Sequence, residues 1–175
     1  MRVSDVGRLV PLVRMVPLAA SIALAAACAE APAAPARADE ATVRAALTTE
    51  LAKFGPAIAT KDAAGVAKLF TEDGTWILPD ATTYSGRAKI EAGAKKFFET
   101  FESASMGQMV IDKLITISDS EALTFSHGTY SMTETGKPPA NHVNPFADYW
   151  KKGNDGVWHV AYEVNADGPA PPAQP

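Results

Sequence analysis

The chain is poor in the residues that form metal sites and nucleophilic centres. Its 175 residues include one cysteine, Cys28, and three histidines, His127, His142 and His159, no two of which share an i, i+4 spacing. Zinc and iron sites usually need such clustered ligands, so we expect no metal and no cofactor. The sequence also has no Gly-x-Ser-x-Gly motif and no glycine-rich phosphate loop. Nucleophilic hydrolysis and nucleotide binding are therefore not indicated.

An excess of positive charge is also absent. The full sequence has a formal net charge of −4, and residues 1–27 hold three arginines and one aspartate, a net of +2, so the remainder carries −6. Its lysines and arginines are scattered rather than gathered into a basic stripe with aromatic residues. Such a surface does not favour nucleic acid as a partner.

Long apolar runs are confined to the N-terminus. The run 15–27 follows a basic start, as in a secretory signal peptide, and is shorter than the roughly 20 residues that span a bilayer. Its end, LAAAC at residues 24–28, resembles the lipobox of bacterial lipoproteins. The resemblance implies cleavage before Cys28 and acylation of that residue, which would tether the protein to a membrane. Ordinary secretion, with cleavage after an Ala-x-Ala group, is the alternative.

Composition divides the chain into four parts. Residues 1–27 are the expected signal peptide, 28–38 an alanine- and proline-rich tether, 39–167 a single domain, and 168–175 a disordered tail. Ala29 stands where an aspartate would favour retention at the inner membrane. By the same resemblance, a Gram-negative host would hold the protein at the outer membrane, facing the periplasm.

The first half of the domain has the apolar spacing of helices. Apolar residues at steps of three and four predict a helix that begins near Asp39 and is kinked, or ends and restarts, at Gly55-Pro56. Asp62 is expected to cap a short second helix that turns Val66, Leu69 and Phe70 inward. Ser85-Gly86 leads into a third helix with an apolar stripe formed by Ile90, Ala94, Phe97, Phe98 and Phe101.

The second half alternates with a period of two. We predict a short strand at 75–78 and four antiparallel strands at 108–117, 121–133, 143–152 and 157–165, divided by polar turns. Because all helices precede the long strands, the helices should pack on one face of a curved antiparallel sheet. This is an α+β fold.

Several short motifs occur in a familiar order. They are KDAAGV at 61–66, LFTEDGT at 69–75, Pro79, SGRAKI at 85–90, DYWKK at 148–152 and DGVWHV at 155–160. Together they resemble the nuclear transport factor 2-like superfamily, in particular its ketosteroid isomerase-like and SnoaL-like branch. The resemblance implies a cone-shaped sheet with three N-terminal helices on its concave face, one enclosed pocket, and a possible homodimer through the outer face of the sheet.

The register of that family places a set of mostly apolar side chains in the pocket. They are Phe54, Trp76, Leu78, Phe98, Tyr130, Met132, Asp148 and Trp150. On an uninterrupted register the last strand turns His159, Ala161 and Glu163 inward and Trp158, Val160 and Tyr162 outward. A slip in the last hairpin would reverse that strand and leave His159 outside, so both arrangements stay open.

The catalytic groups of the steroid isomerases are mostly missing. The resemblance places Leu78 where their aspartate base stands and Phe54 where their oxyanion tyrosine stands, and only Asp148 matches a second oxyanion group. We therefore do not expect a ketosteroid isomerase. Burial in an apolar cone would raise the pKa of Asp148, which makes Asp148 and Tyr130 the candidate catalytic residues of any other acid/base reaction.

Three functions remain compatible with the sequence. The first is an exported, membrane-tethered protein that binds a small apolar or amphipathic molecule in its pocket without catalysis. The second is a metal-independent acid/base enzyme of isomerase, dehydratase or cyclase type that uses Asp148 and Tyr130. The third is a dimeric interaction module of the cell envelope. Fold alone does not choose among them.

Overall fold

The computed structural model describes residues 39–166. The predicted signal peptide (1–27), the tether (28–38) with Cys28, and the tail (168–175) lie outside the described residues. Within the described part of the chain, no helix combines the length and the apolar character needed to cross a membrane.

The predicted first helix is divided in two. Helix α1 (Glu40–Leu51) begins at Asp39, whose carboxylate accepts a hydrogen bond from Thr42 N at 3.1 Å, and helix α2 (Phe54–Ala59) follows after a two-residue break. Pro56 has no N–H to donate to the carbonyl of Ala52, so the hydrogen-bond ladder stops before it. The interruption predicted at Gly55-Pro56 is therefore an end and restart.

Helices α3 (Ala63–Lys68) and α4 (Arg87–Phe98) correspond to the other two predicted helices. Asp62 caps α3 by accepting a hydrogen bond from Gly65 N at 2.8 Å, as predicted. Gly86 precedes α4 with φ of 87°, a conformation that favours glycine. Two predicted helix residues lie elsewhere, because Phe70 begins strand β1 and Phe101 begins strand β3.

Six strands form one sheet. They are β1 (Phe70–Ile77), β2 (Thr83–Ser85), β3 (Phe101–Ser118), β4 (Glu121–Glu134), β5 (Ala140–Lys152) and β6 (Trp158–Asn165), in the spatial order β2-β1-β6-β5-β4-β3. The α+β prediction and the four long strands are confirmed. The sheet is mixed rather than wholly antiparallel, because β1 runs parallel to β6. No hairpin joins those two strands, so no tight turn forces opposite directions on them.

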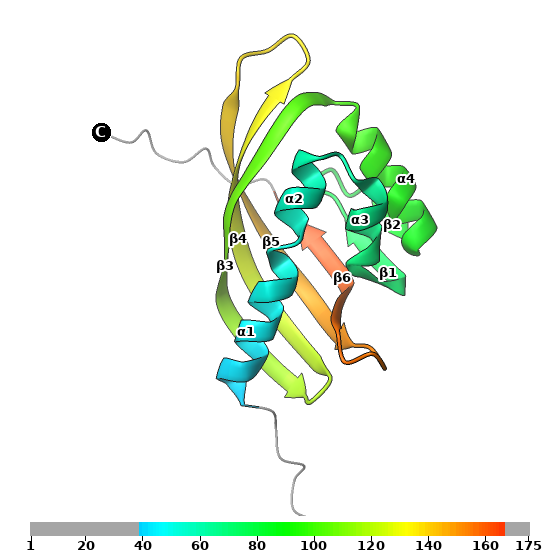
Figure 1. Ribbon diagram of the computed structural model, residues 1–175, viewed down its shortest axis with the longest axis vertical. Coiled ribbons are helices and arrows are strands. Elements are labelled where there is room, and N and C mark those ends of the chain that lie inside the picture. Colours follow the sequence, from blue (N-terminus) through cyan, green and yellow to red (C-terminus); the bar gives the residue numbers. More distant parts are fainter. Residues whose placement is uncertain (1–38, 167–175) are drawn as a thin grey trace, which may run out of the picture. The chain divides into compact units, whose positions relative to one another are not determined.

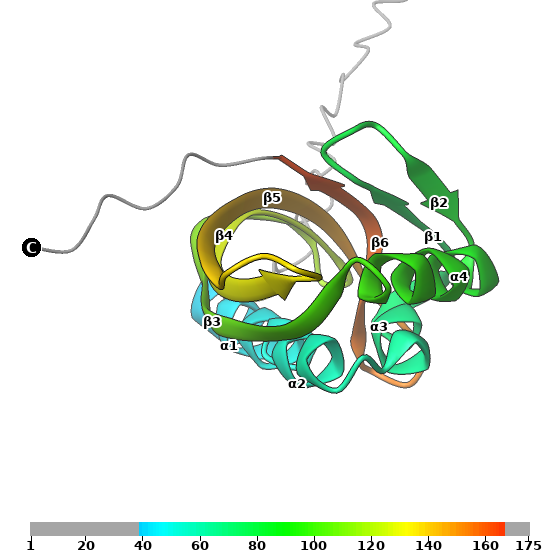
Figure 2. The ribbon, with the colours of Figure 1, turned by 90° about the horizontal axis from the view of Figure 1, so that it is seen from above.

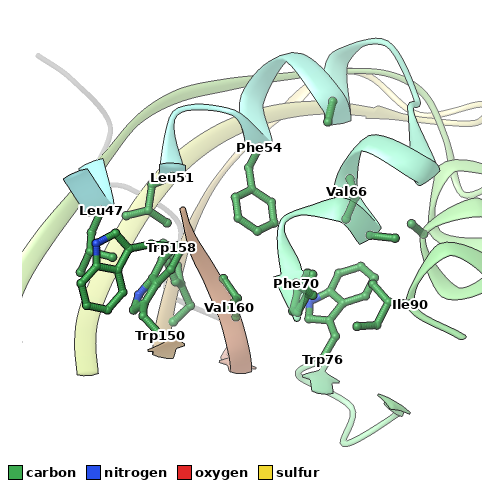
Figure 3. Packing of buried hydrophobic residues seen from close by; sticks show 14 of the residues in the cluster. Leu47, Leu51, Phe54, Val66, Phe70, Trp76, Ile90, Trp150, Trp158 and Val160 are labelled. Atoms are coloured by element: carbon green, nitrogen blue, oxygen red, sulfur yellow. The ribbon is translucent and has the colours of Figure 1, made fainter. Parts of the chain in front are cut away.

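The sheet curves around its helices. Figures 1 and 2 show α1 and α2 running beside β3, while α3 and α4 lie beside β1 and β2. The space between sheet and helices holds the apolar core, part of which is drawn in Figure 3. Burying each large apolar side chain there contributes roughly 1.5–3 kcal/mol, so this packing stabilises the curvature.

A β-bulge in β6 decides which way its side chains point. Asp148 pairs with Glu163, but Trp150 pairs with Val160, which leaves Ala161 as an extra residue. Glu163 and Ala161 are buried, as the uninterrupted register predicts. Beyond the bulge the alternation reverses.

The reversal corrects part of the expected register. Val160 and Trp158, expected outside, are 0% and 4% exposed. His159, expected inside, lies 3.6 Å from Asp155 through Nε2 and Oδ2 and does not line the cavity described below.

Candidate functional site

A cavity of about 390 Å³ lies between the helices and the inner face of the sheet. Every layer of the domain contributes to its wall: helices α1 to α4, the loop after β1, and strands β1 and β3 to β6. Most of the lining is apolar and comprises Leu51, Phe54, Ile58, Val66, Trp76, Leu78, Pro79, Phe97, Ala104, Met106, Met109, Met132 and Phe146.

The structure brings most of the predicted pocket residues to this wall. Phe54, Trp76, Leu78, Tyr130 and Met132 all line the cavity. Leu78 and Phe54, which occupy the positions of the steroid isomerases' base and tyrosine, present no ionisable group to it. The cavity therefore lacks these two catalytic groups of the steroid isomerases.

Three predicted lining residues lie elsewhere. Phe98 packs against Phe101 with ring centroids 5.9 Å apart, and its neighbour Phe97 takes the place on the wall because adjacent helical residues point in different directions. Trp150 and Asp148 are fully buried in the core behind the wall. For Asp148 and Trp150 the correction concerns how deep the side chain sits, which a register argument does not specify.

One end of the cavity is polar. Glu163 reaches the wall from β6, and its Oε1 accepts a hydrogen bond from Asn165 Nδ2 at 2.7 Å. Asn165 in turn accepts a hydrogen bond from Asn144 Nδ2 at 2.8 Å and donates to the carbonyl of Ile77 at 3.3 Å. This network holds the carboxyl group of Glu163 at one end of a cavity whose wall is mostly apolar, Asp80 and Tyr130 being the other polar side chains on it.

Asp148 supports this end from behind. It lies opposite Glu163 on the neighbouring strand, and its Oδ2 has a long contact of 3.5 Å with Thr124 Oγ1, which accepts a hydrogen bond from Trp150 Nε1 at 3.0 Å. Asp148 Oδ1 has no hydrogen-bond partner among the described residues. Burial, and then the charge of Glu163, raise the pKa of Asp148 well above its usual value, while Thr124 opposes them. Its burial beside Glu163 therefore favours the protonated form of Asp148.

Glu163 is the residue at this site that can exchange a proton near neutrality. Burial raises the pKa of Glu163 to about 7, against the opposing effects of the Asn165 hydrogen bond and of Trp76. The Trp76 indole N–H is near enough to act on that pKa, although its geometry is not that of a hydrogen bond. A carboxyl group with this pKa, on the wall of a cavity, can serve as an acid or a base.

The structure does not bring Asp148 and Tyr130 together. Thr124 lies opposite Asp148, and Tyr130 is six residues further along β4, roughly 20 Å away at 3.3 Å per residue. Tyr130 instead stacks on His142, with ring centroids 4.8 Å apart and planes at 14°. The two candidate catalytic residues predicted from the sequence are therefore separated, and only Tyr130 lines the cavity.

Sequence analysis missed Glu163 as a functional residue. The signal was present, because one of the two registers turned this acidic residue into an apolar pocket. Asn144 and Asn165 were missed as well, since isolated asparagines carry no pattern. Within residues 39–166, no three histidine, cysteine, aspartate or glutamate side chains are grouped closely enough to hold a metal ion.

Comparison with known proteins agrees with this architecture. A ketosteroid isomerase-like protein from Erwinia carotovora atroseptica SCRI1043 has a TM-score of 0.62 at 18% identity, covering 72% of this chain and 97% of that one. A hexachlorocyclohexane dehydrochlorinase (LinA) type 2 has a TM-score of 0.65 at 14% identity, covering 77% and 97%. A nuclear transport factor 2-like protein from Salmonella enterica serovar Typhimurium LT2 has a TM-score of 0.62 at 12% identity, covering 77% and 97%.

These identities establish a shared fold and nothing more specific. Proteins of curated function give no match. The sequence of residues 39–163, however, matches the SnoaL-like domain, which covers most of the chain. On this match, the protein belongs to the SnoaL-like domain family.

Proposed function

We propose that the protein binds a small, largely apolar molecule whose single hydrogen-bonding group meets Glu163. The observation that carries this proposal is the cavity itself, an apolar space of about 390 Å³ with one polar end. Its volume lies within the roughly 300–1,000 Å³ of typical ligand pockets. A wall built this way removes apolar surface from water and orients the ligand through one polar contact.

Binding can be measured with N-phenyl-1-naphthylamine, an apolar fluorophore with one N–H group. We expect its emission to rise on saturable binding to the wild-type chain. The Ala104→Trp variant fills the cavity from β3 and should lose this binding. Ser103→Trp is the matched control, because Ser103 is exposed and points to the opposite face of the same strand. Equal binding by both variants would contradict the proposal.

A second candidate function is acid/base catalysis without a metal, and Glu163 is the observation that favours it. Glu163 replaces Asp148 and Tyr130 as the reacting group, because it alone combines a place on the wall with a pKa of about 7. The dehydrochlorinase named above is an enzyme on the same fold, which makes catalysis on this scaffold reasonable by analogy only.

Deuterium exchange into cyclohexanone, followed by proton NMR in heavy water, tests this second function. A Glu163 base should exchange the α-hydrogens faster than buffer, with a rate that rises through neutrality as the carboxyl group ionises. Glu163→Gln should abolish the enhancement, and Glu99→Gln, at an exposed position on the surface, should retain it. An exchange rate equal to that in buffer alone would contradict a role for Glu163 as the base that removes a proton next to the carbonyl group of this ketone.

We propose further that the protein is exported and anchored through acylated Cys28. The support is the lipobox-like sequence at residues 24–28. Cys28→Ser should move the protein from the membrane to the soluble fraction of its native host. Unchanged partitioning would exclude this anchor.

A homodimer through the outer face of the sheet is proposed on the exposure of large apolar side chains there. Phe125, Tyr162 and Val164 are 44%, 53% and 46% exposed on β4 and β6, and Ile115 is exposed on β3. Light scattering after size exclusion should report a dimer for the wild type and a monomer for Phe125→Asp. Ala41→Asp, at an exposed position on α1, is the control. A wild-type monomer would contradict this proposal, and with it the dimeric interaction module of the cell envelope.

A further inference from the structure

A second hollow adjoins the cavity. It is a groove of about 430 Å³ between α1–α2 and β3, two parts of the fold that lie side by side in Figure 2. Small or polar side chains form most of its walls: Thr48, Ala52, Gly55, Ala59, Ser105 and Gln108. No charged side chain lines it.

Two methionines separate the groove from the cavity, because Met106 and Met109 line both. Residues three apart on a regular strand point to opposite faces. Here Met106 pairs with Tyr130 and Met109 with Gly128, so β3 carries one residue more than β4 between these pairs. The resulting bulge turns both methionines to the inner face.

Both side chains between the groove and the cavity are methionines, the most adaptable of the apolar residues. Methionine has an unbranched, flexible side chain that repacks at low cost. On the other side of the groove, Gly55 has no side chain to brace α2 against Met106. The barrier between cavity and groove therefore consists of side chains that can move without displacing the backbone.

We propose that the cavity and the groove are two compartments of one binding site, whose ligand is an elongated amphipathic molecule. The apolar body occupies the cavity, and an uncharged hydrogen-bonding group passes Met106 and Met109 to lie among Thr48, Ser105 and Gln108. The inference rests on the proposed binding function. The hydroxyl and amide side chains of the groove match an uncharged hydrogen-bonding group, and no charged side chain lines the groove to pair with a phosphate or an ammonium group.

Two probes of different shape test the inference. N-phenyl-1-naphthylamine is compact and needs only the cavity, whereas 1-dodecanol is long enough to extend beyond it and is measured by displacing the fluorophore. Ala52→Phe fills the groove from an exposed position. It should weaken dodecanol at least tenfold, the equivalent of roughly two buried methylenes. Binding of the fluorophore should stay within about twofold of wild type. Ala45→Phe, at an exposed position on α1 outside the groove, should change neither affinity.

A reversible cross-link provides a second test that does not depend on groove filling. A Cβ placed on Gly55 lies 3.6 Å from Met106 Cβ, within the range of disulfides. In a full-length Cys28→Ser background, the Gly55→Cys/Met106→Cys pair should therefore clamp α2 to β3 when oxidised. Oxidation should weaken dodecanol binding about tenfold relative to the reduced form of the same variant, and reduction of the same sample should restore the affinity.

The outcomes separate this inference from the function on which it rests. If the wild-type chain binds neither probe, the proposed binding function fails and the inference fails with it. If the fluorophore binds but dodecanol is insensitive to both Ala52→Phe and the oxidised clamp, the two-compartment site is wrong while the cavity remains a binding site. Loss of dodecanol affinity in Ala52→Phe with the fluorophore unaffected, together with a reversible loss of dodecanol affinity on oxidation of the clamp, supports the inference.

Discussion

Replacing Glu163 by glutamine should change how the stability of the protein depends on pH. The pKa of Glu163 is about 7 in the folded chain, whereas an unperturbed glutamate, as in the unfolded chain, has a pKa of 4.5. At a pH below the pKa of the unfolded chain, Glu163 is protonated in both states, and its burial does not lower the free energy of unfolding through ionisation. Between the two values the unfolded state loses its proton while the native state keeps it, so the free energy of unfolding falls as pH rises.

The size of this effect follows from the two pKa values. A shift of about 2.5 pH units corresponds to roughly 3 kcal/mol at 1.36 kcal/mol per unit. That loss is a large part of the 5–15 kcal/mol by which domains of ordinary size are stable. Asp148, whose pKa is raised in the same direction, adds to the fall and begins to do so at lower pH. As far as this pair is concerned, stability should therefore be greatest at acidic pH, below the ordinary aspartate pKa of 3.8, where both carboxyl groups are protonated in the folded and the unfolded chain.

Urea denaturation between pH 4 and 8, followed by fluorescence of the buried Trp76, Trp150 and Trp158, measures the effect. The wild-type chain should lose about 3 kcal/mol relative to Glu163→Gln between pH 4.5 and pH 7. Glu99→Gln, which removes an exposed carboxyl group, should track the wild type. If the wild type and Glu163→Gln keep a constant difference across this window, Glu163 is not desolvated and the reasoning about the polar end of the cavity is wrong.

Three further predictions concern the fold that holds the site. Leu47→Ala, at a position with 0% exposure, should lower the free energy of unfolding by about 2–5 kcal/mol in chemical denaturation, and a loss under 1 kcal/mol would show that α1 packs loosely. Asp62→Ala removes the cap of α3 and should cost about 1 kcal/mol, with Asp62→Asn restoring most of it in the same assay. Deleting Ala161 would remove the extra residue and leave Val160 opposite Trp150 on a regular ladder, so Trp158 and Val160 should stay buried and near-UV circular dichroism should keep its tryptophan signal; loss of that signal would refute the bulge.

The positions of most elements were accessible from local pattern. Asp39 and Asp62 were identified as helix starts because a short acidic side chain before an apolar-periodic run satisfies free backbone N–H groups, and both accept such bonds. The four long strands were predicted correctly because one face of the sheet is buried and the other is exposed to solvent. Apolar and polar residues therefore alternate along each strand with a period of two. Strand β2 escaped detection, since three residues are too few to show a period.

The site was predicted less completely, and particular residues show why. Phe54, Trp76, Leu78, Tyr130 and Met132 could be placed on the wall because the family resemblance supplies a register. Glu163, the one group there that titrates near neutrality, could be assigned an inward direction only on one of two registers. The choice between those registers was not available from local sequence.

What the sequence alone determined was the fold class, the order of its elements, and the absence of the steroid isomerases' base and tyrosine at Leu78 and Phe54. Only the tertiary structure decided that β1 pairs with β6, that bulges at Ala161 and between Met106 and Met109 reset two strands, and that Asp148 lies behind Glu163. The physical reason is that helix caps and alternation arise from contacts between residues close in sequence. Strand pairing, bulges and the burial of a carboxyl group depend instead on which segments, distant in sequence, pack together and bury each other's apolar surface.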